Sequence, residues 1–188
     1  MTQKQERNTS TFPGSLCGFW WCLSIILLTV LDQWTKHLAE IHLKGNQGIS
    51  LIPGVLELSY LENRGMAFGM FQGRQVLFLI LCMAFFAVLL YLYARIPKNK
   101  YYLPLLITGA ALASGALGNF IDRLLYGCVI DFIYVSLIDF PVFNVADIYV
   151  TVSAVLFFIY VIFYYKEEDF QFSLFWWDSA TKMRILIL

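Results

Sequence analysis

The chain has 188 residues, of which 60% are apolar, 18% are aromatic and only 14% are charged. This composition excludes an ordinary soluble globular domain and is typical of an integral membrane protein. The 13 basic and 13 acidic residues leave a formal net charge of zero, so nothing in the overall charge suggests a nucleic-acid partner.

The first apolar stretch, residues 16–38, follows a polar tail, residues 1–15. It is long enough to cross the roughly 30 Å hydrocarbon core of a bilayer as a helix. No small-residue cleavage pattern follows it, so we expect a retained anchor and not a removed signal peptide. Asp32 and Lys36 lie four residues apart near its outer end and therefore share a helix face. Taken alone, they could be a local ion pair that ends the span.

The connection that follows, about residues 39–75, is too long for a simple turn. Residues 56–60 alternate apolar and polar side chains, which predicts a short strand. Residues 63–69 then supply two glycines, which would allow close backbone approach or positive φ, although a plain turn is the simpler interpretation. We therefore expect a small β-sheet element on the outer membrane face.

Three more apolar stretches can span a membrane, at residues 76–94, 101–120 and 145–165. The short loop between the second and third stretches, residues 95–100, carries three basic side chains and no acid. The positive-inside rule places such a loop in the cytoplasm. With four crossings, both termini join it there, including the tail at residues 166–188. The predicted fold class is thus an all-α membrane protein of four transmembrane helices, residues 16–165, with the small sheet on its outer face.

Several ionisable residues lie in or beside these spans, where they are costly and usually functional. Asn119, Asp122 and Arg123 would share one helix face if the third span continues helically, and could form a connected polar network. A purely structural alternative is that Asp122 and Arg123 satisfy each other at a helix end.

Asp131 and Asp147 each stand inside an apolar run without a basic residue nearby in sequence. If both lie at the outer ends of adjacent spans, they can meet. Two carboxyl groups at close range in a poorly solvated site share a proton, so one can activate a water while the other protonates a carbonyl oxygen. The pair thus predicts peptide hydrolysis, although two carboxylates could equally carry protons or cations across a membrane.

Three other classes of protein fit the sequence less well. A proton- or cation-coupled transporter would spread polar residues along its spans, whereas here they gather near one face. A non-catalytic scaffold does not explain the two aspartates, because a protein with only a structural role would be more stable without them. A metal hydrolase is disfavoured because His37 and His42, five residues apart, form no helical ligand pair, and the four cysteines form no C-x-x-C motif. We therefore expect no metal and no cofactor.

Five ordered motifs carry a resemblance to a known family. They are Asp32-Gln33-x-Thr35-Lys36, Asn63-x-Gly65-x-Ala67-Phe68, Gly118-Asn119-x-Ile121-Asp122-Arg123, Val129-x-Asp131-Phe132 and Phe143-Asn144-x-Ala146-Asp147. Together they closely resemble the lipoprotein signal peptidase family, also called signal peptidase II. The resemblance implies a bacterial aspartic endopeptidase that removes the signal peptide from diacylglyceryl-modified prolipoproteins by cleaving before the lipidated cysteine.

The resemblance also implies roles for particular residues and partners. It assigns catalysis to Asp131 and Asp147. It assigns substrate binding or support of the site to Asp32, Lys36, Asn63, Gly65, Asn119, Asp122, Arg123 and Asn144. It further implies a location in the bacterial inner membrane, in contact with membrane lipid and prolipoprotein. With the basic loop in the cytoplasm, we expect the site toward the periplasmic face, and we expect a monomer. Inhibition by cyclic peptide antibiotics such as globomycin is expected on the same ground.

Overall fold

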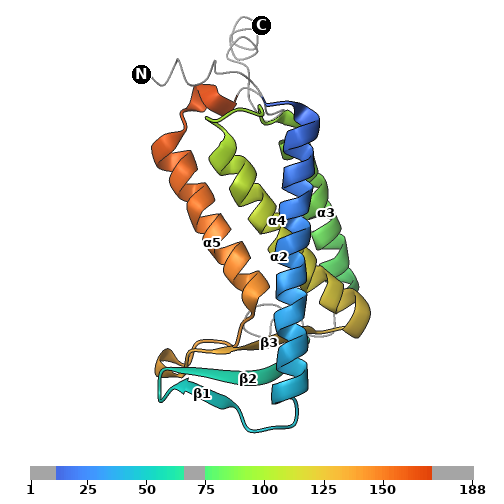
Figure 1. Cartoon of the computed structure of the whole chain (residues 1–188), viewed down its shortest axis with the longest axis vertical. Coiled ribbons are helices and arrows are strands. Elements are labelled where there is room, and N and C mark those ends of the chain that lie inside the picture. The colour runs from blue at the N-terminus through green and yellow to red at the C-terminus, as the bar shows by residue number, and fades with distance from the viewer. Residues whose placement is uncertain (1–11, 66–74, 171–188) are drawn as a thin grey trace, which may run out of the picture.

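A computed structural model describes residues 12–65 and 75–170. Within these ranges four long helices run side by side, and a three-stranded sheet lies across one end of them (Figure 1). The helices are α2 (Gly14–Leu43), α3 (Gln75–Arg95), α4 (Leu103–Tyr126) and α5 (Val145–Ile159), the last continued by a π-helical turn at Tyr160–Tyr164. All four are long and apolar enough to cross a membrane. The fold class predicted from the sequence is therefore confirmed.

Two helices extend beyond the spans expected from hydropathy. α2 continues to Leu43, so the Asp32–Lys36 pair lies inside the helix and does not end it. α4 continues to Tyr126 and ends at Gly127, whose φ of 71° is in the left-handed region that favours glycine. The hydropathy signal fades early in both helices because polar side chains stand near the ends that meet the sheet, at Glu40 and His42 of α2 and at Asp122 and Arg123 of α4.

α4 is the central helix and packs against α2, α3 and α5 (Figure 1). Two of its glycines make this close packing possible. A Cβ atom at Gly115 would lie 2.5 Å from the backbone oxygen of Ala146 on α5, and one at Gly118 would overlap the carboxylate of Asp32 on α2. Small residues of this kind allow membrane helices to approach closely.

The sheet has the antiparallel order β1 (Ile49–Ile52), β2 (Leu56–Asn63) and β3 (Val129–Tyr134). The strand expected at residues 56–60 lies within β2. The strand β3 was not predicted, and it carries Asp131 opposite Leu61 of β2. The expectation that Asp131 lies at the end of a membrane span is therefore wrong. Residues 129–132 are buried without alternation, so β3 lacks the period-two pattern that reveals a half-exposed strand.

The described ends of the chain lie opposite the sheet, beside the loop between α3 and α4 (Figure 1). The backbone N–H of Phe12 donates to the oxygen of Lys98 over 2.7 Å. The 3₁₀ turn Glu167–Phe170 also docks there, because the hydroxyl of Tyr101 donates to Asp169 Oδ2 over 2.8 Å. Both ends and the basic loop thus share one end of the bundle. Most of the expected tails, and Gly69 of the glycine-containing turn, lie outside the described residues.

Candidate active site

Asp131 lies on β3, where the sheet meets the helix bundle, and its side chain is 2% exposed. Oδ1 accepts a hydrogen bond of 2.6 Å from the amide of Asn144, and Oδ2 accepts one of 2.9 Å from the amide of Asn63. Asn63 is the last residue of β2 and pairs with Val129 of β3, so the register of the sheet delivers its amide to Asp131. Each oxygen keeps a second lone pair that can face a substrate.

Asp147 lies in the first turn of α5, and its position is set by a capping box with Asn144. The Asn144 side chain accepts from the backbone N–H of Asp147 over 3.0 Å, and Asp147 Oδ2 accepts from the backbone N–H of Asn144 over 3.1 Å. Asp147 Oδ1 accepts from the amide of Asn119 on α4 over 2.8 Å. Such reciprocal capping fixes both the start of a helix and the carboxylate that caps it.

Asn144 therefore holds both aspartates at once, and it is fully buried. Both aspartates line one open cleft of ≈ 440 Å³, together with Asn63, Asn119 and Arg123. The rest of the lining is mostly apolar and comes from Val129, residues 140–143 and α5. The structure thus brings together the two aspartates that the sequence singled out, although only one of them is on a helix.

The electrostatic setting of Asp131 is that of a carboxyl group withdrawn from water. Burial raises the pKa of Asp131 to about 6, and the nearby Asp147 carboxylate adds to the rise. Hydrogen bonds from Asn63 and Asn144, and the charge of Lys36, oppose it. A carboxyl group with a pKa in this range can exchange a proton near neutral pH, as acid–base catalysis requires.

Behind the cleft, Lys36 of α2 forms a buried ionic cluster with two carboxylates. Its Nζ lies 2.9 Å from Asp32 Oδ2, 2.9 Å from Asp122 Oδ2 and 2.9 Å from Asn119 Oδ1. The ammonium group thereby uses all three of its donors. Lys36, Asp32 and Asp122 are at most 2% exposed. Because Lys36 engages the oxygen of the Asn119 amide, the nitrogen of that amide is left to face Asp147.

The carboxylates of Asp32 and Asp122 also accept hydrogen bonds from the backbone next to Asp147 and Asp131. Asp32 Oδ1 accepts from the N–H of Ala146, the residue before Asp147, over 2.9 Å. Asp122 Oδ2 accepts from the N–H of Ile130, the residue before Asp131, over 3.2 Å. The cluster therefore ties α5 and β3 to the bundle at the positions that carry the two aspartates.

Arg123 lines the cleft, and its contacts differ from those of its sequence neighbour Asp122. Asp122 pairs with Lys36 from another helix, and not with Arg123, so the structural alternative of a local pair is wrong. The guanidinium of Arg123 donates to the backbone oxygens of Asn119 over 3.2 Å and of Gly65 over 3.3 Å, and lies 5.0 Å from the ring of Phe78. Helix geometry points Asp122 toward α2 and Arg123 toward the cleft.

The remaining site residues from the sequence also gather here, and one further residue joins them. Gly65 donates its N–H to Asn63 Oδ1 over 3.0 Å, which orients the amide that contacts Asp131. Gln33, which was not singled out, donates to Asp122 Oδ1 over 2.8 Å and to the oxygen of Gly118 over 3.2 Å. The sequence feature that could have indicated Gln33 is its position in the motif that begins at Asp32. In the described part of the chain, no three Asp, Glu, His or Cys side chains are arranged to hold a metal ion.

The fold and the site define a multi-pass membrane protein in which two aspartates, both hydrogen-bonded to Asn144, lie at one end of the helix bundle. The model of the family described as signal peptidase (SPase) II matches residues 24–163. The chain belongs to this family, which is a family of proteases, as its sequence motifs predicted.

Named relatives and solved structures agree with this assignment. The lipoprotein signal peptidase of Streptococcus thermophilus (strain CNRZ 1066) is 40% identical over 148 residues, which cover 78% of this chain and 93% of the relative. That of Streptococcus pyogenes serotype M5 (strain Manfredo) is 38% identical over 148 residues, 79% of this chain and 94% of the relative. A solved bacterial membrane enzyme is similar with a TM-score of 0.70 at 32% identity, over 76% of this chain and 87% of its own. These matches favour a signal peptidase and give the transporter alternative no support.

Proposed function

We propose that this chain is an aspartic endopeptidase in which Asp131 and Asp147 act as a pair. Its substrates are diacylglyceryl-modified prolipoproteins, from which it removes the signal peptide by cleaving before the lipidated cysteine. The observation that carries the proposal is Asn144, whose side chain binds both aspartates and holds them at one open cleft. The names of the relatives support the substrate class.

The chemistry follows from one shared proton. The ionised carboxylate accepts a proton from a water molecule, whose oxygen then bonds to the carbon of the scissile carbonyl. The protonated carboxyl donates its proton to the carbonyl oxygen. When the resulting gem-diol collapses, the carbon–nitrogen bond breaks, a proton passes to the amine of the lipidated cysteine, and the signal peptide leaves with a new carboxyl group. This sequence of steps involves neither a metal nor a covalent intermediate, and no cofactor is assigned.

The other polar residues of the site support the pair. Asn63, Asn119 and Asn144 present amide donors to carboxylate oxygens, which resists the repulsion between two acids at close range. Asp32, Lys36 and Asp122 hold the elements that carry the pair. Arg123 lines the cleft, where a substrate backbone would pass, and donates to the backbone oxygen of Gly65.

The membrane setting is part of the proposal. The basic loop between α3 and α4 and both chain termini lie in the cytoplasm, and the sheet and the aspartate pair lie near the periplasmic face of the bacterial inner membrane. The chain works as a monomer, and a cyclic peptide such as globomycin inhibits it by occupying the cleft.

The test is turnover by the purified full-length chain in detergent, with a diacylglyceryl-modified prolipoprotein as substrate. Release of the signal peptide should be abolished by Asp131→Asn and by Asp147→Asn, and should survive a chelator. Asp139→Asn is the matched control, because Asp139 is exposed and has a φ of 48°, a conformation that asparagine tolerates. Full turnover by either cleft variant, or loss of turnover with chelator that zinc restores, would refute the mechanism.

A further inference from the structure

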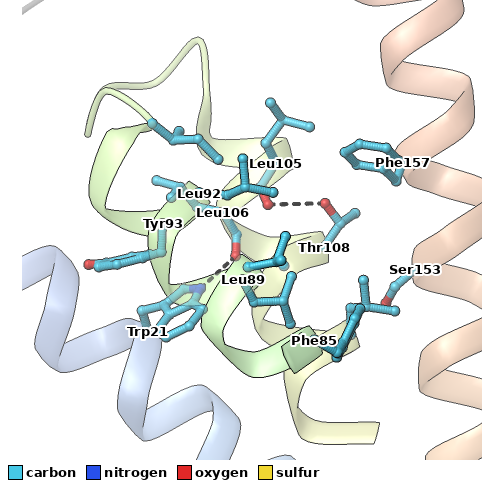
Figure 2. Close-up of a pocket in the computed structure, with 14 residues that line it drawn as sticks. Trp21, Phe85, Leu89, Leu92, Tyr93, Leu105, Leu106, Thr108, Ser153 and Phe157 are labelled. Carbon is cyan, nitrogen blue, oxygen red and sulfur yellow. Dashed lines mark hydrogen bonds between the residues drawn. The ribbon is translucent and has the colours of Figure 1, made fainter. Parts of the chain in front are cut away.

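A second cavity lies between the helices, away from the aspartate pair and toward the loop between α3 and α4. It has a volume of ≈ 200 Å³, and its walls are almost entirely apolar. Figure 2 shows Ser153 and Phe157 of α5 on one side, facing Phe85 and Leu89 of α3 across it. One side is closed by Trp21 of α2, which donates its ring N–H to the oxygen of Leu106 over 3.0 Å and stacks on Tyr93 at 4.3 Å (Figure 2).

The cavity and the catalytic cleft share one face of α4. Leu105, Gly109 and Leu112 line the cavity, and Asn119 and Arg123 line the cleft. These positions are separated by four, three, seven and four residues, so they form a single stripe along one face of the helix. A chain segment lying along this stripe would therefore pass both the aspartate pair and the cavity.

The other two helices show the same continuity. On α5, Val150 lines the cleft and Ser153 and Phe157 line the cavity, at the spacing of one helix face. On α3, Phe78 contacts Arg123 at the cleft, and Phe85, seven residues further, lines the cavity. α3 and α5 each pack on α4 but make little contact with each other. The residues that line the cavity and the cleft therefore lie along one side of α4, between α3 and α5.

We propose that this cavity binds an apolar side chain of the substrate's signal peptide and so acts as a second recognition site for the hydrophobic segment. The inference rests on the proposed function, which brings such a segment to the cleft. A signal peptide has an apolar core of about 7–15 residues before its cleavage site. With the scissile bond at the aspartate pair, that core would run along the shared side of α4, toward the end of the bundle that holds the basic loop.

Distances along the helices indicate which residues of the signal peptide would reach the cavity. At about 1.5 Å per residue, Ser153 lies roughly 9 Å and Phe157 roughly 15 Å beyond Asp147 along α5. A helical signal peptide would present residues about 6–10 positions before the scissile bond at that depth. A dry cavity of about 150 Å³ lined by aliphatic and aromatic side chains binds benzene, so the present one has room for a leucine or phenylalanine side chain.

Gly109 is a lining position from which this site can be filled. A Cβ atom at Gly109 meets no other atom within 4 Å, which means that a side chain there would enter open space. For a prolipoprotein with a leucine-rich core, Gly109→Leu should raise KM about tenfold and leave kcat nearly unchanged, because the lost contact is remote from the reacting bond. Ala87→Leu is the matched control, because Ala87 is exposed on the outside of α3.

A second substrate makes the result specific. Alanine at the positions 6–10 before the scissile bond should bring the KM values of the Gly109→Leu and wild-type proteins together. Equal KM values with the leucine-rich substrate, or an equal rise with Ala87→Leu, would overturn the cavity assignment while wild-type cleavage still upheld the peptidase. Absence of wild-type cleavage would instead refute the proposed function.

A photocrosslinking measurement keeps the assignment testable if Gly109→Leu does not fold. A benzophenone side chain would be placed in the substrate eight residues before the scissile bond and irradiated with the full-length Asp131→Asn protein. The expected crosslinks map to α3 between Phe85 and Leu92, or to Ser153 and Phe157 of α5. Crosslinks confined to the outer surface of α2, or no crosslink at all, would overturn the assignment.

Discussion

The amide of Asn144 donates a hydrogen bond of 2.6 Å to Oδ1 of Asp131. Through its backbone and its side-chain oxygen, Asn144 also caps the helix that carries the second aspartate. A single residue thus couples the start of α5 to the strand β3, and the spacing of the aspartate pair depends on it.

Replacing Asn144 should therefore damage turnover more than stability. Asn144→Ala removes a donor to Asp131 and a helix cap, and we expect turnover to fall about 100-fold while stability falls by about 1 kcal/mol. Signal-peptide release and thermal unfolding in detergent measure the two effects. The control is Asn46→Ala, which removes an exposed hydrogen bond to His42. Wild-type turnover by Asn144→Ala would contradict the bridging role.

The buried lysine should be far more important for folding than its exposed counterpart. Lys36→Met leaves Asp32 and Asp122 without their cation and should cost about 3–5 kcal/mol of stability. Lys44→Met removes exposed pairs with Glu40 and Glu62 and should cost less than about 1 kcal/mol. Chemical unfolding in detergent compares the two variants. Similar losses would show that the cluster around Lys36 is not a buried unit.

Two glycines of α4 provide a matched pair. Gly118→Ala places a methyl group against the Asp32 carboxylate and should lower stability by about 1–3 kcal/mol. Gly109→Ala points into open space and should leave stability unchanged or raise it by about 0.5–1 kcal/mol, because alanine favours a helix. Melting temperatures of the two variants test this contrast, and the reverse order would contradict the packing described between α4 and α2.

The raised pKa of Asp131 predicts how stability depends on pH. Its folded-state pKa of about 6 exceeds its ordinary value of 3.8. The protonated carboxyl therefore contributes to the stability of the folded protein, fully below pH 3.8, and this contribution is lost as the pH rises through 6. Between pH 7 and pH 5, the wild-type protein should gain about 1 kcal/mol relative to Asp131→Asn. Melting temperatures of both proteins across this range measure the gain. A difference that does not change with pH would show that Asp131 titrates normally.

The proposed orientation in the membrane can be tested with single cysteines in a background lacking the four native ones. Lys100 lies in the loop between α3 and α4 and Gln47 lies between α2 and β1, so they stand at opposite ends of the bundle, and both are exposed. An impermeant thiol reagent applied to cells with a permeabilised outer membrane and an intact inner membrane should label Gln47→Cys and spare Lys100→Cys. The opposite labelling would invert the topology.

The sequence was sufficient for the four helices, since each requires only a long apolar run. It was also sufficient to single out Asp131 and Asp147, because an acidic side chain inside an apolar run is costly to keep away from water and is usually functional. It was not sufficient for β3. That strand is buried in its first four residues, so its hydrophobic pattern resembles that of a short buried helix or loop.

The sequence by itself thus determined the class of protein, the number of spans and the identity of the acidic pair, because these depend on composition and local pattern. Only the tertiary structure decided which partners the charges have. Asp122 pairs with Lys36, 86 positions away, and not with adjacent Arg123. Neighbouring helix residues point about 100° apart, so the partner of each charge depends on which helix faces it.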